Sequence, residues 1–348
     1  MRALTVVPRT PGSADLIDIG EPDPEEGDVL VQTLRVGICG TDLELVAGAY
    51  GWAPPGHQRL VLGHESLGRV LEAPEGSGLA RGDLVVGIVR QPDPIPCTNC
   101  AAGEWDMCRN GRYTEHGIKE LDGFARERYR IGPQFAVRVD PSLEGVGVLL
   151  EPASVLAKAW EHTEAIGRRA RWEPRSVLVT GAGPIGLLAA LMGAQRGFEI
   201  HVLNRSEEPL KRRLVEDLGG TFHTGRVQDT GVLADVVIEC TGVPQVVFDA
   251  IDNTAAGGVV CLTGVSPAGR SLTIDAGALN TEIVLENDAI FGSVNANRRH
   301  YEQGAEAMGR ADPGWLERLI TRRIPVDRWD EALQREQGDV KVVLEFAT

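Results

Sequence analysis

The chain has 348 residues, which is more than one hydrophobic core usually supports, so we expect two domains. Its hydrophobic content of 43% and charged content of 24% are those of an ordinary globular protein. The formal net charge of −15 argues against nucleic acid as a partner, because no basic stretch offsets it.

The beginning of the chain predicts no signal peptide, because Met1-Arg2-Ala3-Leu4 leads directly into a strand-like run. Residues 176–195 carry no charge and could imitate a membrane span, but the glycines and Pro184 fit a strand, a turn and a helix better. We therefore expect a cytoplasmic protein with no membrane segment. In a reducing compartment, the six cysteines are more often thiols or metal ligands than disulfides.

Short apolar runs separated by turn residues fill the first part of the chain, to about residue 139. This pattern predicts a small, mostly β domain. The runs lie at 29–36, 59–62, 67–71 and 84–89.

After Glu151 a helical spacing over 152–166 is followed by strands that alternate with helices. This alternation predicts a parallel, doubly wound sheet, and the apolar run 342–346 is a strand that could return to the first domain. We expect one domain over 1–154 and 301–348, and a second over 155–300. The expected elements of the second domain are 177–180, 185–196, 200–203, 207–218, 235–240, 244–253 and 258–262.

A glycine-rich turn joins the first strand and helix of the second domain. In this turn the first glycine permits the tight bend, the second lets the backbone approach a pyrophosphate, and the third lets helix and strand pack closely. The pattern predicts a Rossmann nucleotide-binding fold. The turn is Gly181-Ala182-Gly183-Pro184-Ile185-Gly186.

The next expected strand ends in Asn204-Arg205-Ser206, where an NAD-selective fold usually presents Asp or Glu. Arg205 offers a guanidinium to a 2′-phosphate instead, which favours NADP, with NAD as an alternative cofactor. The alternative structural interpretation is that Arg205 only points into solvent.

Three short motifs carry the types of ligand that a catalytic zinc ion takes. They are Cys39-Gly40-Thr41-Asp42, Gly63-His64-Glu65 and Glu151-Pro152. Alone, a cysteine in an apolar segment is usually a core residue and a His-Glu pair is usually on the surface. Their arrangement at the ends of strand-like runs favours a metal site.

These motifs and the glycine turn, in this order and spacing, resemble the zinc-dependent medium-chain dehydrogenases over nearly the whole chain. The resemblance implies a GroES-like catalytic domain beside the Rossmann domain. It also implies a catalytic zinc bound by Cys39, His64 and Glu65 or its water, with Glu151 near or on the metal. As a hypothesis for the mechanism, Glu151 or Glu65 would carry the proton away, with Thr41 as a hydroxyl relay.

Within that family, several segments resemble the microbial glucose (aldose) 1-dehydrogenases. They are 115–118 with 122–124, Asn204-Arg205, 292–296 and 339–346. The likeness implies that Thr41, Glu115, Glu151 and Asn295 hold sugar hydroxyls. Ser154 lies one turn beyond Glu151, where we expect it to meet the sugar. Without it, Glu115 would be interpreted as a solvated loop carboxylate. We expect further cofactor contacts at Thr241, Thr263, Gly264, Val265, Ser293, Val294 and Asn295.

A second metal site is predicted at Cys97, Cys100 and Cys108, whose spacing resembles the structural-zinc lobe of the family. The fourth cysteine of that lobe is missing here, and Asp93 could substitute, since a carboxylate oxygen is an acceptable zinc ligand. The alternative is a lobe that binds metal weakly or not at all.

The sequence therefore predicts hydride transfer from C1 of an aldose, with D-glucose as the first choice, to NADP. One alternative is a polyol, threonine or plain alcohol dehydrogenase with the same metal and cofactor. Another, of a different class, is a non-catalytic, zinc-stabilised NADP-binding protein. The resemblance also implies a homo-oligomer, either a dimer or a tetramer.

Overall fold

The computed structural model describes residues 1–266, 269 and 271–346, and these form two compact units. Unit 1 comprises Met1–Ser154 and Asn295–Thr348, and unit 2 comprises Val155–Val294. The helix α3 (Leu150–Gly167) contains the junction between them. No helix in the described part of the chain has the length and apolar character needed to cross a membrane.

Unit 1 is built on a seven-stranded sheet whose central strand, β3, carries the first zinc-type motif at its end. The strand order is β11-β6-β5-β3-β19-β18, and β10 also pairs with β3. Their bounds are β3 (Val29–Ile38), β5 (Glu65–Glu72), β6 (Leu84–Gly87), β10 (Arg128–Ile131), β11 (Ala136–Val139), β18 (Ile320–Pro325) and β19 (Lys341–Glu345).

Two small sheets complete unit 1, with strand orders β2-β1-β4 and β7-β8-β9. Helices in this unit are short, apart from α8. The strands are β1 (Arg2–Val6), β2 (Asp15–Asp18), β4 (Leu60–Val61), β7 (Arg90–Gln91), β8 (Thr114–His116) and β9 (Glu120–Leu121). The helices are α1 (Gly40–Val46), α2 (Thr98–Ala101), α8 (Arg298–Gly309), α9 (Pro313–Leu319) and α10 (Trp329–Ala332).

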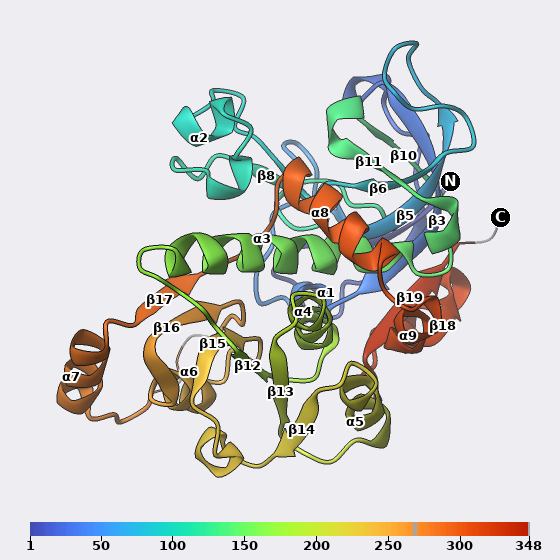
Figure 1. The fold of residues 1–348 in the computed structure, drawn as a ribbon. Coiled ribbons are helices and arrows are strands. Elements are labelled where there is room, and N and C mark those ends of the chain that lie inside the picture. The colour runs from blue at the N-terminus through green and yellow to red at the C-terminus, as the bar shows by residue number, and fades with distance from the viewer. Residues whose placement is uncertain (267–268, 270, 347–348) are drawn as a thin grey trace. The chain divides into compact units, whose positions relative to one another are not determined.

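Unit 2 is a six-stranded, all-parallel sheet in the order β14-β13-β12-β15-β16-β17. Its apolar β-branched strands are buried among the helices, as expected when both faces of a parallel sheet are covered. The strands are β12 (Ser176–Thr180), β13 (Glu199–Asn204), β14 (Thr221–Thr224), β15 (Ala234–Glu239), β16 (Thr254–Leu262) and β17 (Ala289–Gly292). The helices are α4 (Pro184–Ala194), α5 (Pro209–Glu216), α6 (Pro244–Ile251) and α7 (Ala276–Glu286) (Figure 1).

The predicted combination of a mostly β domain with a doubly wound parallel sheet is confirmed, and residues 341–345 do join the sheet of unit 1 (Figure 1). The ends of most elements differ from the prediction, by up to four residues. The helix expected over 207–218 occupies only Pro209–Glu216, since Pro209 fits the first helical turn. The strand expected over 258–262 begins at Thr254, because a register shift lets its pairing with β15 pass Gly257.

Candidate active site

Cys39 lies at the junction where β3 ends and α1 begins. Its Sγ accepts a hydrogen bond from the backbone N–H of Thr41 at 3.2 Å, and its own N–H donates to Asp42 Oδ2 at 2.9 Å. This reciprocal capping satisfies two backbone donors at the helix start. It fixes the thiol and the Asp42 carboxylate at one end of a buried strand.

His64 reaches the same place from the turn between β4 and β5. Gly63 makes the turn possible, because its φ is +86° and a Cβ there would lie 2.7 Å from Val36. His64 Nε2 lies 3.0 Å from Cys39 Sγ, and Nδ1 faces Asp42 Oδ1 at 3.5 Å. Burial opposes protonation, but the charges of Cys39 and Asp42 outweigh it and raise the pKa of His64 well above its ordinary value.

Glu65 is buried beside these groups and is held by Lys341, which the sequence analysis did not single out for a role. Lys341 Nζ lies 2.6 Å from both carboxylate oxygens of Glu65 and donates to the carbonyl of Ile38 at 3.3 Å. Both side chains are almost fully buried. Gly37 leaves room for the carboxylate, since a Cβ there would lie 2.1 Å from Glu65 Oε2.

The arrangement fits a metal ion. Ligand atoms of Cys39, His64 and Glu65 all lie within 4.8 Å of one another, and thiolate, imidazole and carboxylate are the donors that zinc takes. Asp42 faces the outer nitrogen of His64, which is how protein carboxylates orient a metal-binding imidazole. A bound metal would take the place of the His64 proton, because a ligating imidazole must be neutral.

Glu151 begins α3, and burial raises its pKa to about 7, with His64 lowering it and Glu65 raising it. A carboxyl group with this pKa exchanges protons near neutral pH. Thr41 lies near Tyr50, a half-buried tyrosine that the sequence analysis did not single out. Ser154 is completely buried and its hydroxyl donates to the carbonyl of Glu151 at 2.6 Å. The structure therefore leaves Ser154 no exposed surface for the predicted sugar contact.

The predicted sugar residues Glu115 and Asn295 lie together although 180 residues separate them. Asn295 Nδ2 donates to Glu115 Oε1 at 2.8 Å. Glu115 is buried and paired with Arg90. The alternative interpretation of Glu115 as a solvated loop carboxylate is therefore wrong. Asn295 has a φ of +62°, a strained conformation that asparagine tolerates better than most residues.

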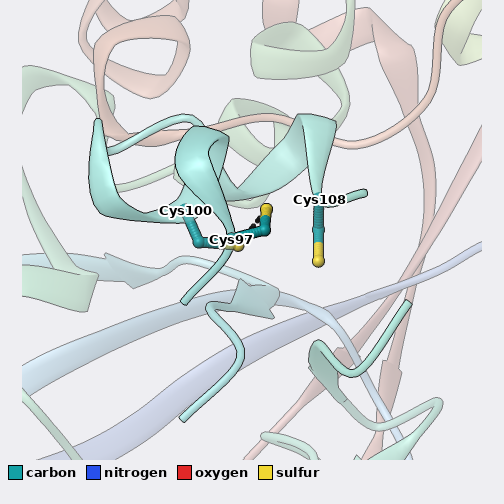
Figure 2. Close-up of side chains that lie close together, drawn as sticks. All are labelled: Cys97, Cys100 and Cys108. Atoms are coloured by element: carbon teal, nitrogen blue, oxygen red, sulfur yellow. Dashed lines mark hydrogen bonds between the residues drawn. The ribbon is translucent and has the colours of Figure 1, made fainter. Parts of the chain in front are cut away.

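The three cysteines of the second predicted metal site gather around the short helix α2 (Figure 2). Cys97 Sγ lies 3.6 Å from Cys100 Sγ, and the ligand atoms of Cys97, Cys100 and Cys108 all lie within 4.8 Å of one another. Asp93 is not part of this cluster. Its Oδ1 accepts the N–H of Ile95 at 2.8 Å, and its buried Oδ2 has no hydrogen-bond partner among the described residues.

In unit 2 the glycine turn has the geometry that a pyrophosphate needs. Gly181 has a φ of +94°, and a Cβ on Gly186 would lie 1.8 Å from the Gly181 carbonyl oxygen. A Cβ on Gly183 would meet nothing within 4 Å, so that side of the turn is open at the start of α4, where Pro184 and Ile185 follow. The N–H of Ala182 donates to Asn204 Oδ1 at 3.4 Å. A phosphate at this helix N-terminus would meet unpaired N–H groups.

Asn204 ends β13, and its Nδ2 donates to the carbonyl of Ser206 at 2.8 Å. The neighbouring Arg205 is exposed and makes no ion pair or hydrogen bond with the residues that the structure describes. The turn after β15 is fixed by Glu239, a buried carboxylate that sequence reasoning missed. It accepts hydrogen bonds from Thr180, Thr241 and Gly242.

The remaining predicted cofactor residues follow the ends of β16 and β17. Thr263 donates to the Glu239 carbonyl, and Gly264 packs so closely that a Cβ would lie 2.1 Å from the Gly242 nitrogen. Val265 and Val294 are 81% and 56% exposed, which is unusual for valine. Ser293 Oγ is buried and has no hydrogen-bond partner within the described chain.

Comparison with known proteins places this architecture in a family. Residues 144–346 match the model of the glucose dehydrogenase C-terminus, and residues 25–141 match the alcohol dehydrogenase GroES-like domain. The chain is 42% identical to glucose 1-dehydrogenase 1 of Caldivirga maquilingensis and 40% identical to glucose 1-dehydrogenase of Methanocella arvoryzae, each over 99% of both chains.

A similar solved structure is glucose dehydrogenase of Haloferax mediterranei in complex with NADP, Zn and gluconolactone. It is 34% identical, with a TM-score of 0.92 over 100% of both chains. Together with the full-length relatives, it shows that the chain belongs to the zinc-dependent medium-chain dehydrogenases, in the family of the microbial glucose dehydrogenases.

Proposed function

We propose that this protein is a zinc-dependent aldose 1-dehydrogenase that oxidises C1 of D-glucose with NADP and releases the aldonolactone. The observation that carries the proposal is the buried donor set in which Cys39 Sγ lies 3.0 Å from His64 Nε2, with Glu65 beside them. Support comes from the similarity to the Haloferax mediterranei enzyme, whose complex holds NADP, Zn and gluconolactone.

The residues that would hold the catalytic metal are Cys39, His64 and Glu65, with Glu151 near or on it. Zinc at this position supplies a Lewis acid that lowers the pKa of an oxygen bound to it. Glu151 would accept the proton of the C1 hydroxyl, because its pKa of about 7 lets it act as a base near neutral pH. Thr41 would relay that proton.

Glu115 and Asn295 would bind the other sugar hydroxyls. A carboxylate and an amide held in one network are left unpaired by a simple alcohol, so they favour a polyhydroxylated substrate. The lactone product can be opened by water after release.

The residues that would hold NADP are those of the 181–186 turn together with Asn204, Arg205 and Ser206. NADP held there would supply the nicotinamide that takes up the hydride from C1. Arg205 supports NADP over NAD, because its guanidinium has no partner among the described residues and can meet a 2′-phosphate. Thr241, Thr263, Gly264, Val265, Ser293 and Val294 are proposed to complete the cofactor contacts.

The second metal site is proposed as structural zinc on Cys97, Cys100 and Cys108. Their thiols are free, as are those of all the cysteines, which also supports a reducing, cytoplasmic location. Asp93 would need to turn its buried, unpartnered Oδ2 toward the thiols to serve as the fourth ligand.

A homo-oligomer, dimer or tetramer, is proposed as well. β17 is an edge strand of the sheet in unit 2, and the helix before it exposes apolar side chains at Val284 and Leu285. Exposed apolar groups of this kind commonly mark protein–protein contacts.

The test is reduction of NADP by zinc-loaded protein, followed by absorbance, with D-glucose, other aldoses, sorbitol, threonine and ethanol. We expect the fastest turnover with D-glucose, and loss of turnover in a chelator. Cys39→Ser should lose zinc and reduce turnover at least ~1000-fold, about 4 kcal/mol, while NADP still binds. Its control is Cys261→Ser, a buried cysteine outside the metal clusters.

Turnover of a polyol or alcohol but of no aldose would support zinc-dependent hydride transfer and contradict the proposal that the substrate is an aldose. If protein that contains zinc and binds NADP reduces no NADP with any of these substrates, the result would instead favour a non-catalytic binding protein. Activity of metal-free Cys39→Ser would contradict the proposed metal site.

A further inference from the structure

Arg90 is a buried arginine beside the proposed sugar site to which the proposed function assigns no role. It is 6% exposed and begins the two-residue strand β7, where it lies opposite Glu115 of β8. A buried guanidinium is costly unless its N–H groups are paired, so its partners indicate what it does.

The Arg90 guanidinium contacts three neighbours. Its Nε and Nη2 donate to Glu115 Oε1 at 3.0 and 2.9 Å, and its Nη1 donates to the backbone carbonyl of Asp106 at 3.0 Å. Its Cζ lies 3.7 Å from the centroid of the Tyr113 ring, within the range of a cation–π contact. The planar guanidinium therefore makes hydrogen bonds and a ring contact at the same time. The ammonium group of a lysine could not reproduce this set of contacts.

The two oxygens of Glu115 are used unequally. Oε1 accepts three hydrogen bonds, two from Arg90 and one from Asn295 at 2.8 Å. Oε2 receives none from the residues that the structure describes, although Glu115 is only 9% exposed. A carboxylate oxygen has two acceptor positions, so Oε2 is left for a donor from outside the protein.

Asn295 has a settled orientation in the same network. Its Oδ1 accepts the N–H of Ala296 at 2.9 Å, so its Nδ2 is the group that faces Glu115. The Asn295 amide thus gives Oε1 of Glu115 a further hydrogen bond and gives Oε2 none.

We propose that Arg90 is a positioning residue for the substrate: it fixes Oε1 of Glu115 so that Oε2 accepts a hydrogen bond from a sugar hydroxyl. This inference rests on the proposed function and deepens it. Because a preformed acceptor costs no reorganisation on binding, the contribution of Arg90 appears in sugar affinity rather than in cofactor binding.

The test is the KM for D-glucose and for NADP in Arg90→Lys, Glu115→Gln and the double variant. We expect Arg90→Lys to raise the KM for D-glucose about tenfold or more, with a smaller change in kcat and an unchanged KM for NADP. The double variant should be little worse than Glu115→Gln alone, because both changes disable the same acceptor.

Monodeoxy analogues of D-glucose give a second readout that a merely structural role would not move. The wild type should penalise the analogue that lacks the hydroxyl facing Oε2, and Arg90→Lys should penalise it less. KM does not depend on the fraction of folded enzyme, so the comparison holds even where the variant folds poorly.

The matched control is Arg126→Gln, which removes another buried arginine from an ion pair, with Glu26. It should lower Tm without changing the KM for D-glucose. An Arg90→Lys enzyme with unchanged KM, or additive effects in the double variant, would overturn the inference alone. A wild type that oxidises no aldose would overturn the proposed function first and this inference with it.

Discussion

Lys341 holds a residue of the proposed metal site, Glu65, from a distant part of the chain. It is separated from Glu65 by 276 residues, yet its ammonium contacts both oxygens of that carboxylate. The pair is almost fully buried, and Gly37 leaves the space that it fills. Breaking such a pair from one side leaves an uncompensated charge in the interior, which costs more than the pair itself contributes.

Lys341→Met should therefore lower the free energy of unfolding by about 3–5 kcal/mol, because Glu65 would remain buried without a cation. Urea denaturation of the zinc-free protein measures this. The double variant Lys341→Met with Glu65→Gln should recover part of the loss. If the single variant is as stable as the wild type, Lys341 does not hold Glu65 in solution.

Residues of this kind explain where sequence reasoning stopped. The zinc-type motifs could be located because Cys39, His64 and Glu151 stand in short, recognisable patterns. Arg90 stands in no pattern, and Lys341 lies in the family-like segment 339–346 without any sign of its partner. The roles of both depend on residues that are 25 and 276 positions away. The hydrogen bond of Ser154 could not be predicted for a related reason, since spacing along a helix does not say that its hydroxyl donates to the Glu151 carbonyl.

At the scale of elements, the strand-turn-helix unit β12-turn-α4 was predictable nearly to the residue, because each glycine has a separate steric role. Gly186 allows α4 to touch the turn, whereas Gly183 faces open space. The two glycines therefore differ in what an added methyl group would disturb.

Gly186→Ala should destabilise the fold by about 1–3 kcal/mol, because its Cβ would overlap the Gly181 carbonyl. Gly183→Ala should cost about 0.5–1 kcal/mol, because alanine is a poorer N-cap residue than glycine, but should weaken NADP binding at least about tenfold. Thermal unfolding and NADP titration on both variants separate these effects. Equal loss of stability in both would contradict the assigned roles.

Element ends were harder to predict than element types. The strand β16 extends back to Thr254 past Gly257 because a register shift accommodates the extra residues. Strand propensity and the hydrophobic period of the sequence describe the regular part of a strand. Neither indicates a bulge, because a bulge depends on the pairing with the neighbouring strand.

At the scale of the whole molecule, association between copies is proposed from one region of unit 2. Val284 and Leu285 are 62% and 73% exposed at the end of α7, before the edge strand β17. An apolar patch beside an unpaired strand edge is typical of a contact between subunits.

Sedimentation of the wild type should therefore give a dimer or tetramer of the 37.4 kDa chain. The double substitution Val284→Glu with Leu285→Glu should shift it to monomer, because two charges would be buried in the contact. Leu233→Glu changes an equally exposed apolar residue and serves as the control. A monomeric wild type, or an unchanged oligomer in the double variant, would contradict the proposed subunit contact.

The placement of β19 between β3 and β18 has a consequence for synthesis on the ribosome. The strand β3, which ends at Ile38, and the lysine that neutralises Glu65 are about 300 residues apart in the chain, so a growing chain that lacks β19 has an incomplete sheet and a Glu65 without its cation. Long-range pairings of this kind form slowly and leave sheet edges exposed. Unit 2, whose strands all lie within one continuous segment, is complete before β19 is made, so we expect it to fold first and the sheet of unit 1 to close only once residues 341–345 are available.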